Sequence, residues 1–293
     1  MGALQNHMIS EMKLRGYSET TISMYIKGVR NFAYYFGKTP LSISQSEIRD
    51  YFIDLIEKNS SQAKLRICYS SLKLFYTIHD QPHYLDFLPS PKPSHTIPDV
   101  LDQKEIENIL SLCRTLRYKT LFALIYSSGL RISEVINLQV SDIDFSRKTI
   151  HVRNSKNGKD RYTILSEKVI MLLRFYFNRY KPMTHLFFSV RDNSKVISKR
   201  HIQHVFHNLI KEAHISKNAH VHTLRHSFAT HLLENNTNLF YIMQLLGHAS
   251  ISSTLIYLHM QRLDKMNIKS PLDTADISIN SYPNIPQLYL NIA

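Results

Sequence analysis

The chain has 293 residues and carries 36 lysines and arginines against 23 aspartates and glutamates, a formal net charge of +13. This length supports one or two domains, and the positive charge favours a polyanionic partner, nucleic acid before an anionic membrane. Cys68 and Cys113 are the only cysteines and no apolar run is long enough to span a bilayer, so a disulfide framework and a membrane protein are excluded and a cytoplasmic location is expected.

Residues 1–80 carry apolar side chains at helical spacing throughout, which predicts a domain of four packed helices. Ser18 is a cap candidate for the longest of these helices, and Gly37 ends it. Ser44 and Glu47, three residues apart, form a capping box that begins the next helix. The first part of the chain is therefore expected to be a helical domain.

Five prolines fall within residues 81–98 and disfavour a regular helix there. Proline-rich segments are extended and semi-rigid, so this segment is predicted to be a linker between two domains. The second domain is then expected to span residues 99–269, and residues 270–293 remain as a tail.

The second domain contains a strongly apolar helix that Gly129 ends, followed at once by Arg131 and, three residues later, by Glu134. An arginine against so apolar a segment is desolvated and needs an anion, which Glu134 can supply on the protein side. We expect Glu134 to orient the site rather than to react, and an ordinary surface glutamate remains the alternative.

Residues 149–153 and 161–165 alternate apolar and polar side chains around a polar, basic turn, which predicts a β-hairpin. Lys156 and Lys159 both lie in this turn. A further amphipathic helix is predicted over residues 166–180.

Another helix, predicted over residues 198–213, carries a run of histidines three residues apart. They are His201, His204 and His207. Positions three apart drift around a helix, and no cysteine or carboxylate completes a ligand set, so no metal is expected and structural or phosphate-backbone roles are favoured. His226 and His231 are interpreted as packing or capping residues.

The last strong apolar pattern comprises two amphipathic helices joined to a turn. Thr223 is predicted to cap the first helix, which sets His222 and Arg225 together at a helix N-terminus, where free N–H groups favour a phosphate. Gly247 ends the second helix, so that His248 leaves the helix at a turn.

These residues closely resemble the signature of the tyrosine recombinases, the phage-integrase family. The family's HxxR motif corresponds to His222–Arg225, its LGH motif ends at His248, and its nucleophilic tyrosine, nine residues later, is Tyr257. The sequence around Arg131 matches the family's first arginine box. The resemblance implies a mainly α fold with a small antiparallel β-sheet, in which an N-terminal helical core-binding domain precedes a catalytic domain.

A phosphodiester repels nucleophiles and has a strongly basic leaving group, so its cleavage requires positive charge, a nucleophile and an acid. Arg131 and Arg225 are expected to hold the phosphate oxygens, and Tyr257 is expected to attack. His222 is our first choice as acceptor of the tyrosine proton, and His248 is expected to donate a hydrogen bond to the phosphate.

The family resemblance places a general acid in the hairpin turn, where a lysine protonates the departing 5′ oxygen. Lys156 follows Arg131 at close to the expected spacing, but Asn157 stands where the family usually has glycine. Lys159 therefore remains a rival. The residues expected to bind DNA are Lys64, Arg66, Lys73, Lys159 and Arg161.

The function implied is that of a site-specific DNA recombinase acting through a 3′-phosphotyrosyl intermediate and a Holliday junction, without metal, ATP or another cofactor. Its expected partners are double-stranded DNA with inverted-repeat sites and three further copies of itself in a tetramer. The alternatives are a type IB topoisomerase-like relaxing enzyme and a catalytically silent DNA-binding accessory protein or repressor.

Ser270–Asp273 resembles the tail of integron integrases, whereas the helical insertion typical of that subgroup does not occur before the HxxR motif. The subgroup, Xer-type or integron-integrase-like, therefore stays open. The tail of residues 270–293 is rich in isoleucine and leucine, and it is expected either to fray or to dock on a neighbouring protomer.

Overall fold

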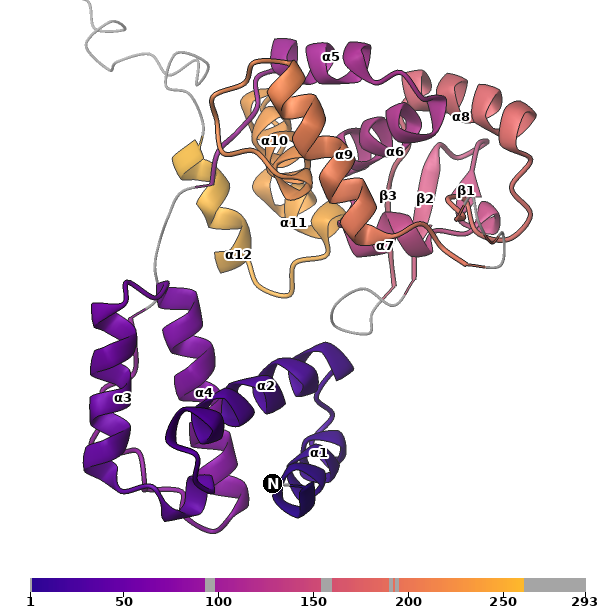
Figure 1. The fold of residues 1–293 in the computed structure, drawn as a ribbon. Coiled ribbons are helices and arrows are strands. Elements are labelled where there is room, and N and C mark those ends of the chain that lie inside the picture. The colour runs from indigo at the N-terminus through magenta and orange to yellow at the C-terminus, as the bar shows by residue number, and fades with distance from the viewer. Residues whose placement is uncertain (1, 93–97, 154–159, 190–191, 193–194, 261–293) are drawn as a thin grey trace, which may run out of the picture. The chain divides into compact units, whose positions relative to one another are not determined.

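The computed structural model describes residues 2–92, 98–153, 160–189, 192 and 195–260. The chain divides into two compact units, Met1–Thr96 and Ile97–Ala293 (Figure 1). Both units are mainly helical, and the strands of the described residues form one small antiparallel sheet, which confirms the predicted fold class. None of the described helices is both long and apolar enough to cross a membrane.

The described residues of the first unit form four α-helices and one 3₁₀ turn. These are α1 (Gly2–Leu14), α2 (Glu19–Phe36), η1 (Pro40–Ser42), α3 (Gln45–Glu57) and α4 (Gln62–Ile78). The hydroxyl of Ser18 accepts the first-turn amide of Thr21, and Gly37 ends α2 in the left-handed conformation. The predicted capping box of Ser44 and Glu47 begins α3. Local sequence signals therefore set these helix ends.

The segment predicted to begin the linker belongs instead to the first unit. Residues 82–87 form successive turns, and Leu85 is only 1% exposed within the core of that unit. The hydroxyl of Tyr84 donates a 2.7 Å hydrogen bond to the carbonyl of Ile43. Prolines forbid regular helix but permit turns, so the apolar side chains between them can still pack, and the first unit extends past residue 80.

The second unit holds the remaining elements. They are α5 (Gln103–Leu112), α6 (Leu116–Ser128), α7 (Ile132–Asn137), η2 (Val140–Asp142), β1 (Ile143–Asp144), β2 (Thr149–Val152), β3 (Arg161–Ile164), α8 (Glu167–Tyr180), α9 (Lys199–Glu212), α10 (Val221–Glu234), α11 (Leu239–Leu246), α12 (Ser252–Leu255) and η3 (Ile256–Met260).

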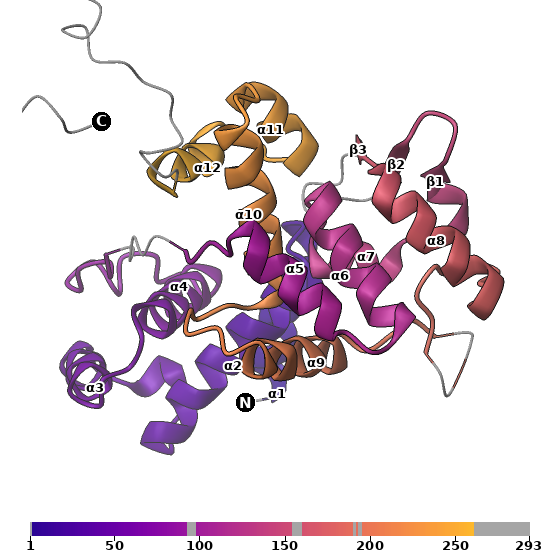
Figure 2. The same ribbon diagram turned by 90° about the horizontal axis from the view of Figure 1, so that it is seen from above.

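Helices α6 and α10 form the centre of the second unit. They pack against each other, and α6 also packs against α8 (Figure 2). A helix that is apolar on every side must be buried, and Leu121, Phe122, Leu124 and Ile125 of α6 are fully buried. These two helices carry the chain segments that position the site described below.

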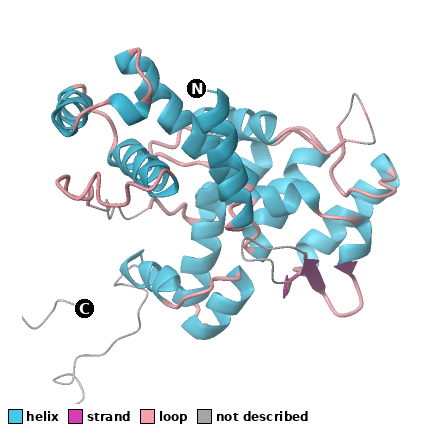
Figure 3. Cartoon of the chain, turned by 90° about the horizontal axis from the view of Figure 1, so that it is seen from below, coloured by secondary structure: helices cyan, strands magenta, loops and turns pink. Residues whose placement is uncertain are grey.

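The sheet has the order β1–β2–β3, and every neighbouring pair is antiparallel. The predicted hairpin is present as β2 and β3, with Ile150 opposite Thr163, both buried. Figure 3 shows the small share of the unit that the strands make up. The turn that joins β2 to β3, residues 154–159, lies outside the described residues.

A second, smaller apolar core joins the last helices to α10 and α11. It includes Phe228 of α10, Leu246 of α11, and Tyr257 and Met260 of η3. Because Tyr257 and Met260 pack into this core, the end of the described chain is held against α10 rather than free.

Candidate active site

Arg131 and Glu134 are placed by the junction between α6 and α7. Gly129 ends α6 at φ 62°, and Arg131 is the N-terminal flanking residue of α7. The backbone N–H of Arg131 donates to Oε2 of Glu134 at 2.7 Å, and its Nη1 donates to Oε1 at 2.7 Å. A capping carboxylate at the start of α7 therefore also fixes the guanidinium of Arg131.

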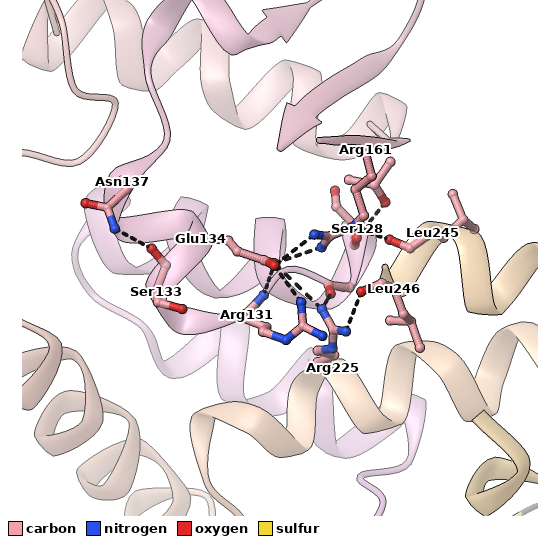
Figure 4. A network of polar contacts seen from close by, with 11 residues as sticks. Ser128, Arg131, Ser133, Glu134, Asn137, Arg161, Arg225, Leu245 and Leu246 are labelled. Carbon is pink, nitrogen blue, oxygen red and sulfur yellow. Dashed lines mark hydrogen bonds and ion pairs between the residues drawn. The ribbon is translucent and has the colours of Figure 1, made fainter. Parts of the chain in front are cut away.

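Arg225 lies in α10 and its side chain is only 1% exposed. Its Nη1 donates to the carbonyl of Gly129 and its Nη2 to the carbonyl of Leu246, each at 2.6 Å, so that it joins the C-terminal ends of α6 and α11 (Figure 4). Burial lowers the pKa of Arg225 to about 9, with Arg131 adding to the lowering and Glu134 opposing it. The guanidinium therefore stays protonated at neutral pH.

Arg161 is not on the DNA-binding surface that the sequence predicted for it. Its side chain is 8% exposed. Its Nη1 and Nη2 donate to the two carboxylate oxygens of Glu134 at 2.8 Å, and its Nε donates to the carbonyl of Leu245 at 2.9 Å. All three nitrogens are thus bonded inside the protein, because the sheet turns this face of β3 toward α7 and α11.

Glu134 is the carboxylate on which three guanidinium groups converge, as Figure 4 shows. Besides its bonds to Arg131 and Arg161, its Oε2 lies 3.7 Å from Nη1 of Arg225. Burial by itself would raise the pKa of Glu134, but the hydrogen bonds and charge of Arg161, the backbone N–H of Arg131 and the charge of Arg225 lower it to about 2. Both carboxylate oxygens of Glu134 are thus bonded within the protein, and the carboxylate compensates the charge of the arginines that surround it.

Tyr257 is carried by η3 and is 2% exposed. Its ring is nearly parallel to that of His248, with 6.2 Å between the ring centroids. Burial raises the pKa of Tyr257, and the guanidinium groups of Arg225 and Arg131 oppose that rise. The phenol therefore keeps its proton at neutral pH, and it lies within the positive field of the arginines.

His226 is the residue that interpretation of the sequence missed. Its Nδ1 lies 3.3 Å from the hydroxyl of Tyr257, whereas the sequence predicted His222 as the partner of that hydroxyl. The rings of His222 and His226 are 4.6 Å apart between centroids, at an interplanar angle of 84°. The sequence signal that could have indicated His226 is its distance of four residues from His222, since residues four apart in a helix share one face.

His222 is the more accessible member of this pair and is exposed at the surface. Partial desolvation of its ring, and then the charges of Arg225 and Arg131, lower the pKa of His222. Thr223, the predicted cap of α10, instead occupies the third helical position and accepts the amide of His220 at 3.0 Å. The helix therefore begins at Val221, and His222 lies within its first turn.

His248 follows Gly247, which ends α11 at φ 63° as predicted. The Nδ1 of His248 lies 2.9 Å from the hydroxyl oxygen of Thr254 in α12. Burial, and then the charges of Arg225 and Arg131, lower the pKa of His248 to about 4. The ring is therefore neutral at pH 7 and has a single N–H to donate.

Further residues were predicted to act as the general acid, to bind DNA or to have other roles. Lys156 and Lys159 fall outside the described residues. Lys64, Arg66 and Lys73 are exposed on α4 of the first unit. The histidines of α9 are exposed as well, and in the part of the chain that the structure describes no three histidine, cysteine or acidic side chains are grouped to hold a metal ion.

Comparison with known proteins connects this arrangement to a family. Residues 99–263 match the Phage integrase family, and residues 4–80 match the N-terminal SAM-like domain of phage integrases. The chain belongs to the phage integrase family. It is 33% identical over 272 residues to a tyrosine recombinase of Thermosipho africanus, across 87% of this chain and 93% of that protein. It is 31% identical over 248 residues to tyrosine recombinase XerA of Pyrococcus horikoshii, across 84% of this chain and 85% of that protein.

A solved structure of the recombinase XerH, bound to a palindromic difH substrate, shares the fold with a TM-score of 0.72. The two chains are 21% identical, and the match covers 85% of this recombinase and 78% of XerH. These relatives confirm the predicted resemblance to Xer-type tyrosine recombinases. The protein is a site-specific DNA recombinase, and neither the topoisomerase nor the silent DNA-binding alternative is favoured.

Proposed function

We propose that this recombinase cuts DNA with Tyr257 as its nucleophile and conserves the bond energy in a 3′-phosphotyrosyl intermediate. The observation that carries the proposal is the convergence of helix ends described above. Arg225 of α10 bonds the ends of α6 and α11, and Glu134 lies close to both Arg225 and Arg131. The phenol of Tyr257 contacts His226, the next residue of α10. This arrangement supplies the charge and the nucleophile that phosphodiester cleavage requires.

In this proposal Arg131 and Arg225 bind the non-bridging oxygens of the scissile phosphate as fixed forks that are charged at neutral pH. His222, exposed at the start of α10, and His248 donate further hydrogen bonds to the same phosphate. Glu134 holds the guanidinium groups in register and takes no part in proton transfer. The electrostatic stabilisation comes from these side chains, so the reaction is proposed to need no metal ion, ATP or other cofactor.

Lys156 is proposed as the general acid that protonates the departing 5′ oxygen, with Lys159 as the alternative in the same turn. An alkoxide is a strongly basic leaving group, so a proton delivered in the transition state lowers the barrier substantially. The strands that flank this turn support the assignment. Arg161, in the second of them, bonds Glu134 directly, so the hairpin reaches the site.

We infer that the DNA partner carries inverted-repeat recombination sites, on which four copies exchange strands through a Holliday junction in the cytoplasm. The first unit is proposed to bind the duplex as a core-binding domain through Lys64, Arg66 and Lys73, and residues 99–269 to act as the catalytic domain. Residues 270–293 are proposed to dock on a neighbouring protomer. That XerH binds a palindromic substrate supports the two-fold symmetry of such a site.

The test is a cleavage assay on a nicked suicide duplex, in excess chelator and without ATP. The parent protein is expected to form a covalent protein–DNA adduct, and Tyr257→Phe is expected to bind the duplex equally well but to form none. Tyr241→Phe is the matched control, since Tyr241 is 61% exposed on α11 and should form the adduct as the parent does. An adduct that persists in Tyr257→Phe, or cleavage that requires a divalent ion, would contradict the proposal.

A further inference from the structure

Helix α10 presents two histidines, one turn apart, beside the arginine that binds the phosphate. His222 and His226 are four residues apart and their rings are in edge contact, but they differ in what they reach. His222 is exposed, whereas His226 is half-buried and its Nδ1 is 3.3 Å from the Tyr257 hydroxyl. The pair therefore divides into an outer ring that faces solvent and an inner ring that contacts the phenol.

The other groups around the phenol are poor acceptors for its proton. Arg225 and Arg131 have donors only. The Nδ1 of His248 is already paired with the Thr254 hydroxyl at 2.9 Å, and no hydrogen bond joins His248 to Tyr257 among the described residues. Glu134 is bonded on both oxygens by Arg161 and Arg131. Of these neighbours, His226 alone offers a lone pair within hydrogen-bond distance of the hydroxyl.

We propose that His226, rather than His222, is the catalytic residue that accepts the phenolic proton of Tyr257 during strand cleavage. The proposal rests on the assignment of Tyr257 as the nucleophile. His222 is left to bind the phosphate from the outer side of the pair. The ring contact between the two histidines then holds His226 with its Nδ1 toward the phenol.

The proton and electron balance of the step is complete with groups already named. The phenol oxygen bonds to phosphorus as its proton moves to Nδ1 of His226, and the bond from phosphorus to the 5′ oxygen breaks. The electron pair of that bond stays on the 5′ oxygen, which takes a proton from the general acid. In the second half, a 5′-hydroxyl attacks the phosphotyrosine and returns its proton to the general acid, and the imidazolium of His226 returns its proton to the tyrosine.

The protonation states of the resting site are consistent with this direction of transfer. Burial, and then the neighbouring His222 and Arg225, lower the pKa of His226 to about 4, so its ring is neutral at pH 7. Nδ1 accepts when the other ring nitrogen carries the hydrogen. Burial raises the pKa of Tyr257, so the phenol does not lose its proton without an acceptor.

The experiment compares four proteins: the parent, His226→Asn, His226→Ala and His222→Asn. Asparagine places its amide close to the position of Nδ1 and keeps much of the packing, but it cannot take up a proton. Adduct formation on the suicide duplex should slow by roughly 10²–10⁴-fold in both His226 variants, at unchanged duplex affinity. His214→Asn, at an exposed position just after α9 whose left-handed backbone (φ 52°) asparagine tolerates, is the matched control and should cleave like the parent.

The decisive comparison replaces Tyr257 in each protein by trifluorotyrosine, whose phenol is more acidic. A phenol that ionises readily has less need of an acceptor, so fluorination should recover much of the cleavage rate in the His226 variants and little of it in His222→Asn. Because each variant is compared with its own fluorinated form, a lower yield of folded protein cancels from the ratio. A structural role for His226 would leave this ratio unchanged.

A substrate whose bridging 5′ oxygen is replaced by sulfur separates the acceptor from the acid. Sulfur should rescue Lys156→Ala, or Lys159→Ala if that residue is the acid, and should not rescue His226→Asn. Parent-like cleavage by His226→Asn, or fluorotyrosine rescue confined to His222→Asn, overturns the assignment of His226. An adduct that maps to a different tyrosine refutes instead the nucleophile on which the proposal rests.

Discussion

An arrangement of three guanidinium groups around one carboxylate is stable only while the carboxylate is ionised. Arg131, Arg161 and Arg225 repel one another, and Glu134 is the anion that compensates them inside the protein. Removing one partner from a buried ionic network leaves uncompensated charge, which costs more than the whole network contributes. The residue that takes no part in the chemistry is therefore the one whose loss should most damage the site.

We expect Glu134→Gln to lower the free energy of unfolding of the second unit by about 3–5 kcal/mol at pH 7. The pKa of Glu134 is lowered from 4.5 to about 2, so its contribution is complete above pH 4.5 and disappears as the pH falls through about 2. The stability difference between parent and variant should shrink over that interval. Denaturant unfolding from pH 7 to pH 2 measures it, with the exposed Glu167→Gln as control.

A difference that stays constant down to pH 2 would show that Glu134 does not owe its effect to its charge. If the variant is as stable as the parent at pH 7, the three arginines are compensated in some other way.

Arg161 was predicted to bind DNA, whereas its bonds in the structure indicate a role inside the protein, and a substitution can separate the two. We expect Arg161→Lys to be destabilised and slow in cleavage, because the single nitrogen of an ammonium does not reproduce the planar fork whose three nitrogens bond both oxygens of Glu134 and the carbonyl of Leu245. Its affinity for duplex, and the slope of that affinity against salt concentration, should equal those of the parent. A shallower salt slope at unchanged stability would instead identify Arg161 as a residue that binds phosphate.

At the scale of elements, the site is assembled from helix ends rather than from helix faces. The C-terminal ends of α6 and α11 supply the carbonyls of Gly129 and Leu246, which Arg225 bonds, and the start of α7 supplies Arg131. Free carbonyls at a helix C-terminus need donors, so a buried arginine satisfies them and is at the same time held in place. Small movements of these ends are therefore expected to disable the arginine.

Gly129→Ala should show this coupling. A Cβ at Gly129 would lie 2.5 Å from the Phe228 ring and 2.9 Å from Leu246, and the left-handed backbone at φ 62° is itself unfavourable for alanine. We expect a destabilisation of about 2–5 kcal/mol from strain and overpacking together, with cleavage reduced more than duplex binding. Unfolding and cleavage assays on the same preparation measure both effects.

Gly37→Ala is the matched control for the backbone term, because Gly37 has φ 63° and its Cβ would meet nothing within 4 Å. This substitution should lower the free energy of unfolding by only about 1–2 kcal/mol and leave the cleavage rate unchanged. Equal effects of the two substitutions would mean that the close packing of Phe228 and Leu246 against Gly129 does not matter.

At the scale of the whole molecule, the positive charge is shared unequally between the two units. Residues 1–98 carry 11 basic against 8 acidic side chains, and residues 99–293 carry 25 against 15. Lys64, Arg66 and Lys73 are nevertheless exposed together on α4, and within the described residues no acidic side chain pairs with them. Unpaired cations on one helix are available to phosphates in a way that paired ones are not.

Replacing Lys64, Arg66 and Lys73 together by alanine should weaken duplex binding and reduce the salt slope of log affinity by about 0.9 for each phosphate that is no longer neutralised. Lys58→Ala is the control, because Lys58 is paired with Asp54 at 2.8 Å on α3. Titration of a labelled duplex at several salt concentrations gives both slopes. An unchanged slope in the triple variant would assign these residues to an ordinary solvated surface.

The sequence by itself determined most of the helix ends that it predicted, the hairpin and the family, because each depends on short-range rules. Ser44 and Glu47 form a capping box through bonds between neighbours, and Gly37, Gly129 and Gly247 end helices through a backbone conformation that glycine adopts at little cost. The motifs around Arg131, Arg225 and Tyr257 were visible for the same reason, as they are spacings along one chain.

Only the tertiary structure decided which of these residues touch. Leu85 packs in the first unit although prolines surround it, Arg161 turns inward to Glu134 twenty-seven positions away, and His226 rather than His222 reaches Tyr257 thirty-one positions away. Local rules cannot separate two histidines on one helix face, since both satisfy the same periodicity. Their difference arises when η3 packs against α10, because the phenol of Tyr257 then lies against His226 while His222 keeps an exposed surface.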